Sequence, residues 1–185
     1  IQVSINRTNV DDFNTDDRVG FGFGVYHSFF AAKMLNLVVG LEYNRTSQFK
    51  NSMYNGHYSQ AKNMRYNLNA ISIPVDVRYN IGSNIKFFVE AGAFADLLIR
   101  TNRVGTVETL VSPNTPEQKY VNTEVNERTN ISNSYGIHLG IGVRIPVSDY
   151  ELLIKPDYKL GLNNLSADLN DMYNSYFRLN VGLRF

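Results

Sequence analysis

Apolar and polar residues alternate along several stretches of this chain, and this alternation limits its fold more than any other feature. In the last ten residues, YFRLNVGLRF, every second residue from Phe177 to Phe185 is apolar. Successive side chains of a β-strand point to opposite faces, so each such stretch predicts a strand with one apolar and one polar face. Eight stretches follow the pattern, at residues 1–7, 19–29, 35–44, 70–80, 85–100, 135–147, 151–162 and 176–185. The sequence therefore predicts an all-β fold of eight strands.

The composition predicts one domain, residues 1–185, and excludes several classes of site. The net charge is +1, from 18 Lys and Arg against 17 Asp and Glu, so no basic surface predicts a nucleic acid partner. The absence of cysteine excludes disulfides, zinc ribbons and thiol nucleophiles. No stretch approaches the roughly 20 apolar residues that a membrane-spanning helix needs, so a membrane would have to be crossed by strands.

The connections between the predicted strands alternate between short and long. The short ones are Phe29–Met34, Asn80–Asn84 and Ser148–Tyr150, and the long, polar ones cover 9–17, 48–64, 101–132 and 164–174. This places both termini at the end of the short turns. Outer-membrane barrels have short periplasmic turns and long external loops, so we expect periplasmic termini and extracellular long loops.

Within the parts of the strands that would cross a membrane, the charged residues lie on the polar faces and the apolar faces carry none. We expect a luminal charge network of Glu42, Asp76, Arg78, Lys86, Glu90, Asp96, Arg100, Arg144, Lys155, Asp157, Lys159, Arg178 and Arg184. Three features favour a membrane barrel over a soluble sheet. The strands are long, the polar faces hold many glycines that a narrow lumen needs, and aromatic residues gather at strand ends. The expected aromatic girdles are Phe29, Tyr43, Tyr66, Tyr79, Phe87, Tyr135, Tyr150, Tyr176 and Phe185. We therefore predict an eight-stranded antiparallel up-and-down transmembrane β-barrel with its arginines inside and its leucines against lipid.

These strand patterns also carry a family resemblance. The stretches AISIPVDVRYNI, FFVEAGAFADLLI, YGIHLGIGVRI, YELLIKPDYKLGLNNL and YFRLNVGLRF together resemble the outer-membrane β-barrel domain family abundant in Bacteroidota, often labelled porin family or PorT family. The architecture is similar to the small barrels of the OmpA and OmpX type, and the terminal Phe185 resembles the signal that barrel assembly machinery reads. The resemblance implies the outer membrane of a Gram-negative bacterium. Its motifs are strand patterns, so it implies no catalytic activity.

Thirteen charges in a narrow lumen would be costly unless they are paired, so we expect networks of Arg and Lys with Asp and Glu. Such a network either fills the barrel as a plug or borders a small pore or proton path. Eight strands leave an interior just wide enough to be filled, which favours the plug.

Other candidate chemistry is weak. His27, His57 and His138 lack ligand spacing, so we expect no metal and no cofactor. Ser134 and His138 share the luminal face with Glu42 nearby, but the pattern turns His138 away from lipid, so we expect no catalytic residues and no enzyme. The stretch DDFNTDD, 11–17, could bind a divalent cation or bridge lipopolysaccharide, and a solvated acidic loop is the default.

The longest loop, 101–132, has alternating valines and predicts a hairpin standing above the membrane, whose edge could accept a strand from a partner. We expect a non-enzymatic structural or interaction protein, with a PorT-like accessory role in secretion or assembly as the specific form that the resemblance implies. Its expected partners are outer-membrane lipid, lipopolysaccharide and other outer-membrane proteins. The alternatives are a narrow porin-like channel and a soluble lipocalin-like carrier with an apolar cavity.

Overall fold

The computed structural model describes residues 1–8, 18–30, 33–54, 56–111, 119–129, 131–165 and 173–185. Within these ranges the chain forms nine strands and contains no helix that could span a membrane. The strands are β1 (Gln2–Thr8), β2 (Arg18–Phe29), β3 (Leu35–Tyr54), β4 (Ser59–Ile81), β5 (Lys86–Leu110), β6 (Tyr120–Arg128), β7 (Ser134–Val147), β8 (Tyr150–Gly161) and β9 (Tyr176–Arg184).

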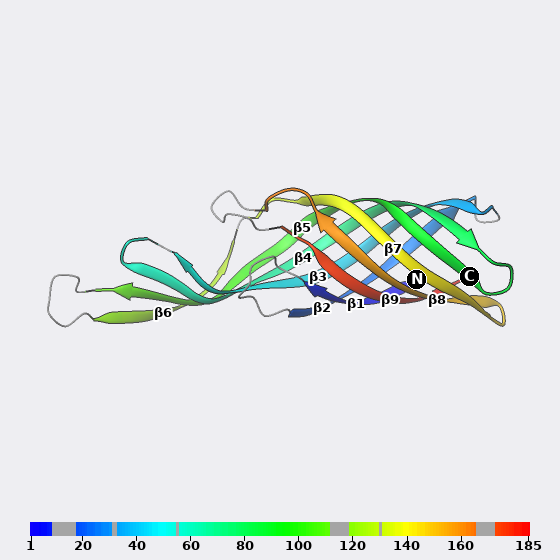
Figure 1. Cartoon of the computed structure of the whole chain (residues 1–185). Helices are drawn as coiled ribbons and strands as arrows, with labels where there is room; N and C mark the ends of the chain where they lie inside the picture. Colours follow the sequence, from blue (N-terminus) through cyan, green and yellow to red (C-terminus); the bar gives the residue numbers. More distant parts are fainter. Residues whose placement is uncertain (9–17, 31–32, 55, 112–118, 130, 166–172) are drawn as a thin grey trace.

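Eight of these strands close an antiparallel barrel, as the sequence predicts. The order is β4-β3-β2-β1-β9-β8-β7-β5, and the pairing of β4 with β5 completes the ring. Strand β6 lies outside the ring and pairs with the far half of β5, from Asn102↔Arg128 to Leu110↔Tyr120. Both termini lie at one end of the barrel, which we call the turn end, and the long hairpins extend from the opposite hairpin end (Figure 1).

The two faces of the barrel differ sharply in chemistry. Outward side chains such as Leu139, Ile141 and Val181 are 56%, 61% and 42% exposed, and the inward residues between them are buried. A soluble carrier would instead turn its apolar rows toward a cavity, so that alternative is wrong. The narrow interior also explains inward glycines: a Cβ on Gly142 would lie 2.4 Å from the Phe88 ring.

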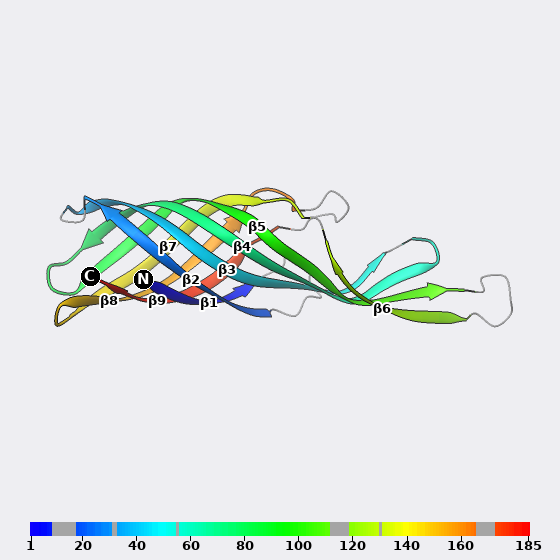
Figure 2. The same cartoon turned by 180° about the vertical axis from the view of Figure 1, so that it is seen from behind.

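One of the long connections differs from the sequence expectation, and another agrees with it. Residues 48–64 were expected to form a loop, but β3 and β4 continue through most of this range with pairs such as Gln48↔Tyr66 and Ser52↔Lys62. The alternation that marks the barrel wall fades here because Asn51 and Ser52 of β3 are both exposed, so both faces of the strand meet water. The hairpin predicted within 101–132 is confirmed by the β5–β6 pairing. Figure 2 shows both hairpins extending past the barrel wall.

A small apolar core lies where these hairpins leave the barrel. Met64, Tyr66 and Leu68 of β4 are at most 2% exposed, and they form one cluster with Ile131 and Leu165. Val107 of β5 and Val125 of β6 pack against this cluster. An apolar cluster thus lies at the hairpin end of the barrel, whereas the middle of the lumen holds the buried charged residues.

Candidate functional site: the luminal charge network

The barrel wall positions a set of charged side chains by strand alternation alone. In β4, for example, the positions of Ser72, Asp76 and Arg78 differ by even numbers, so all three side chains point inward. Ten of the thirteen predicted luminal charges are buried by this arrangement: Glu42, Asp76, Arg78, Glu90, Asp96, Arg144, Lys155, Asp157, Lys159 and Arg178. Their strands are spread around the ring, so the closed barrel brings together residues that are far apart in the chain.

One half of the network is centred on Arg178. Its guanidinium donates to both oxygens of Asp157 at 2.8 Å and to Glu42 at 2.7 Å. Lys159 also donates to Glu42 at 2.7 Å and to the Ser72 hydroxyl at 2.6 Å. Each carboxylate thus has two or more donors, the condition under which buried charge pairs are tolerated.

The other half is centred on Glu90. Arg78 contacts one of its oxygens at 2.5 Å, and Lys155 contacts the other at 2.8 Å. Lys155 also lies 3.2 Å from Asp157, which joins the two halves. The guanidinium of Arg78 also packs over the Phe88 ring, 4.3 Å from its centroid, in a cation–π contact.

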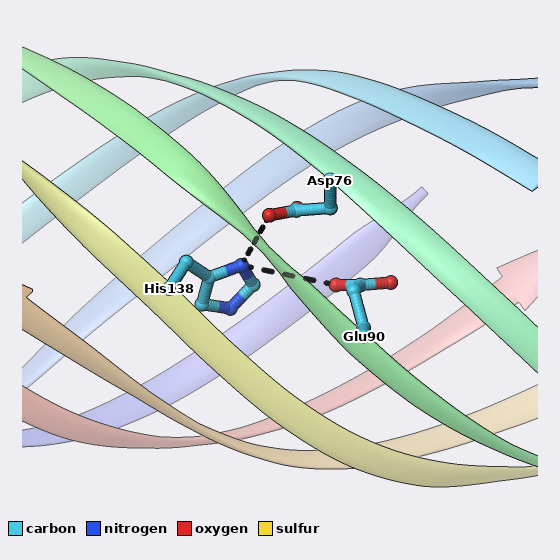
Figure 3. Close-up of side chains that lie close together, drawn as sticks. All are labelled: Asp76, Glu90 and His138. Atoms are coloured by element: carbon cyan, nitrogen blue, oxygen red, sulfur yellow. Dashed lines mark hydrogen bonds and ion pairs between the residues drawn. The ribbon is translucent and has the colours of Figure 1, made fainter.

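His138 connects the network from β7. Its Nδ1 lies 2.8 Å from Asp76 and 3.9 Å from Glu90 (Figure 3). Its Nε2 lies 3.0 Å from Asp157. Two ring nitrogens that both face carboxylates can both donate only in the doubly protonated imidazolium.

The charges at the centre of the barrel support this protonation state. The buried central carboxylates are five, Glu42, Asp76, Glu90, Asp96 and Asp157, and the buried central cations are four, Arg78, Lys155, Lys159 and Arg178. A protonated His138 supplies the fifth positive charge and makes this set neutral. The arrangement therefore fits a self-neutralised plug across the lumen.

The same histidine is part of a possible metal-ligand set. Asp76, Glu90 and His138 offer ligand atoms that lie within 4.8 Å of one another. However, Arg78 and Lys155 already contact Glu90 and would repel a metal ion next to it. The residues present thus fit an ion-pair network better than a metal centre.

A nucleophilic site receives little support from this geometry. Both nitrogens of His138 are held by carboxylates, so neither is available as a base for Ser134. Ser134 Oγ, Asp76 Oδ2 and Asp96 Oδ1 are buried without a hydrogen-bond partner. The other oxygen of Asp96 accepts from Asn174 at 2.9 Å.

A second cluster lies at the turn end, around Glu151 of β8. Lys86 lies 3.0 Å from this carboxylate, Arg144 3.1 Å and Arg184 2.8 Å. Burial raises the pKa of Glu151, but the hydrogen bond from Lys86 and the charges of Arg144 and Arg184 outweigh burial and hold the pKa below its usual value. Of the predicted luminal residues, Lys86 and Arg184 thus lie at the mouth of the barrel, with side chains 34% and 29% exposed.

Three predicted positions need correction. Arg100 is exposed on the outer face. In the pairing of β4 with β5, Asn69 pairs with Arg100 and Ala70 pairs with Leu98, so Ile99 is an extra residue in β5. This bulge reverses the inward and outward phase of the residues that follow it. Tyr66 and Tyr176 are 2% and 0% exposed, so neither belongs to a girdle. Both stand on the inward rows of their strands: Tyr66 joins the apolar cluster, and the Tyr176 hydroxyl lies 3.4 Å from Asp96.

The other girdle residues lie at the two ends of the wall. Phe29, Tyr79, Phe87, Tyr150 and Phe185 are exposed toward the turn end, Tyr135 is exposed toward the hairpin end, and Tyr43 there is partly buried. The acidic stretch 11–17 lies outside the described residues.

Sequence reasoning missed several polar partners of the network. Tyr26 donates to Glu42 at 2.5 Å, and Asn180 donates to Asp157 at 2.9 Å. Their inward phase was readable from the alternation, but their partners became evident only with the strand pairing. His138 was assigned to the lumen, and its bridging role was not.

Comparisons with known proteins agree with this architecture. Residues 2–167 match the family described as "Outer membrane protein beta-barrel domain". Neisserial surface protein A (NspA) is 12% identical, with a TM-score of 0.51 over 98% of this chain and 92% of that chain. Ail of Yersinia pestis, solved with the heparin analogue sucrose octasulfate, is 12% identical over 100% of this chain and 97% of that chain, with a TM-score of 0.46. No curated protein matches the sequence.

Proposed function

Because the chain belongs to the outer membrane protein β-barrel domain family, we propose that it is a non-enzymatic structural or interaction protein of the bacterial outer membrane. In this proposal the lumen is filled and does not conduct, and the β3–β4 and β5–β6 hairpins face the cell exterior as contact surfaces. The termini and the short turns face the periplasm.

The observation that carries the proposal is the dense pairing of buried charges in the lumen. The side chains of Glu90, Asp157, Lys155 and Lys159 are 0% exposed, and each has an ion-pair partner within 4.0 Å. A conducting path needs water along the lumen, and charges this well paired have little need of it.

The hairpins support the interaction part of the proposal. Strand β6 is exposed along almost its whole length, and among the described strands it pairs only with β5, so one of its edges is open to a partner strand. Recruitment into a secretion or assembly complex, as a PorT-like accessory subunit, is the specific form of this idea that rests on the family resemblance.

The first test is the conductance of the refolded protein in a planar bilayer. The wild type, Glu90→Ala and Glu108→Ala are compared. Glu108 of β5 pairs with Lys62 of β4 where these strands extend past the barrel wall, so Glu108→Ala controls for removal of one carboxylate. We expect no conductance from the wild type or from Glu108→Ala. Steady wild-type conductance that changes in Glu90→Ala and not in Glu108→Ala would replace the plug with the narrow channel.

A further inference from the structure

We infer that the turn end of the barrel binds the phosphate headgroup of a membrane lipid, through Arg184 and Lys86. This site lies outside the central network and goes beyond the proposed function. It rests on an excess of positive charge, a cavity without carboxylates, and an apolar groove that continues from the cavity along the outer wall.

The charge excess comes from three cations that share one carboxylate. Lys86, Arg144 and Arg184 all contact Glu151, at 3.0, 3.1 and 2.8 Å. In the described part of the chain no other ion pair is formed by these three cations, so they share a single carboxylate as their ion-pair partner. The Nε of Arg144 is also buried without a hydrogen-bond partner. Arginine and lysine grouped in this way favour a phosphate, which can accept from several donors at once.

A cavity opens beside this cluster. It has a volume of about 360 Å³, and Arg184 and Arg78 line it together with Gln2, His27 and Ser28. Its lining includes no Asp or Glu side chain. An anion entering the mouth would therefore meet Arg184 and neutral hydrogen-bonding side chains.

The cavity continues into an apolar groove, which distinguishes a lipid from a free anion. The groove has a volume of about 260 Å³ and is lined by Val3, Leu152 and Val181 of the outer wall. It shares Ile1, Gln2, Leu183 and Phe185 with the cavity. A molecule with a phosphate at one end and an acyl chain at the other fits both parts at once.

The position of the cluster along the barrel agrees with the level of lipid headgroups. Tyr150 and Phe185 stand next to Glu151 and Arg184 in the chain, and their rings meet edge to face with centroids 6.2 Å apart. Both rings are exposed, and such aromatic residues are enriched at the level of lipid headgroups. Arg184 therefore lies where lipid phosphates are concentrated.

The test measures lipid binding by native mass spectrometry of the full chain refolded in a nonionic detergent. The probes are dimyristoyl phosphatidylglycerol, dimyristoyl glycerol without the phosphate, and inorganic phosphate. We expect phosphatidylglycerol to bind and dimyristoyl glycerol not to bind. Arg184→Gln should weaken phosphatidylglycerol binding about tenfold or more, the loss typical of one charge-assisted hydrogen bond.

Three further variants decide the interpretation. Arg100→Gln removes the same charge from an exposed position far from the turn end and should bind like the wild type. Lys86→Gln should weaken binding as Arg184→Gln does, and Glu151→Gln should strengthen it, because the competing carboxylate is gone. Equal losses in Arg184→Gln and Arg100→Gln would overturn the inference. Equal binding of the lipid without phosphate, or displacement of phosphatidylglycerol by equimolar inorganic phosphate, would also overturn it.

Discussion

At the scale of single residues, the luminal charges are held by shared partners and not by isolated pairs. Asp157 accepts from Arg178, His138 and Asn180, and it also lies 3.2 Å from Lys155. Moving a charge out of water costs several kcal/mol, and the ion-pair partners of the charge offset this cost. Removing one partner therefore leaves the other buried charges without full compensation. The network should therefore be more sensitive to loss of a shared carboxylate than to loss of a surface pair.

Asp157→Asn tests this sensitivity. The substitution keeps the shape of the side chain and removes its charge, which leaves Arg178 and Lys155 undercompensated. We expect it to lower the free energy of unfolding by about 3–5 kcal/mol, measured by urea unfolding in lipid vesicles with far-ultraviolet circular dichroism. Glu108→Gln, which disrupts a partly exposed pair with Lys62, should cost about 1 kcal/mol or less. Equal costs for the two variants would contradict the shared-partner account.

The sequence predicted which residues face inward better than it predicted their partners. Alternation was enough to place Glu42, Asp76 and Arg178 in the lumen. It could not show that His138 bridges Asp76 and Asp157, because these residues lie 62 and 19 positions away in the chain. Arg100 was misplaced because one extra residue in a strand reverses the phase, and no residue type near Ile99 marks the bulge.

At the scale of elements, the strands are longer than the barrel that they form. Strands β3, β4 and β5 have 20, 23 and 25 residues, whereas a strand needs only about 9–11 residues to cross a bilayer once. The alternation of apolar residues fades beyond the barrel wall, where both faces of β3 are exposed, and for this reason the sequence predicted a loop at residues 48–64. The β5–β6 hairpin was predictable because Val107 and Val111, and then Val121 and Val125, are spaced by an even number of residues and so share one face of each strand.

Shortening the β5–β6 hairpin tests whether it is separate from barrel folding. Replacing residues 106–124 with Asn-Gly would join Gly105 to Val125, which already pair, through a two-residue turn. We expect the barrel to form, seen as a faster-migrating folded band on an unheated gel, because β6 pairs with β5 alone among the described strands. A small loss of stability is expected, since Val107 leaves the apolar cluster. Failure to refold would mean that the hairpin is needed for closure.

At the scale of the whole molecule, closure allows the apolar rows to face outward. A barrel has no open edge in its wall, so every wall strand finds backbone partners on both sides without water. The ring of β4-β3-β2-β1-β9-β8-β7-β5 meets this condition, and its filled interior replaces the hydrophobic core of a soluble protein with ion pairs. The energetic cost of an outward charge should then depend on where along the molecule it is placed.

Leu139→Arg and Val121→Arg test this dependence. Leu139 is 56% exposed on the wall, where its strand neighbours are Ala91 and Tyr158, whereas Val121 is 42% exposed on β6 beyond the barrel. By exposure alone the two substitutions would look alike. If lipid surrounds the wall, an arginine at Leu139 should cost about 2–4 kcal/mol of unfolding free energy near the bilayer midplane. The arginine at Val121 meets water and should change stability by about 0.5 kcal/mol or less. Urea unfolding in vesicles measures both, and similar small costs would mean that the outward face of β7 does not contact lipid.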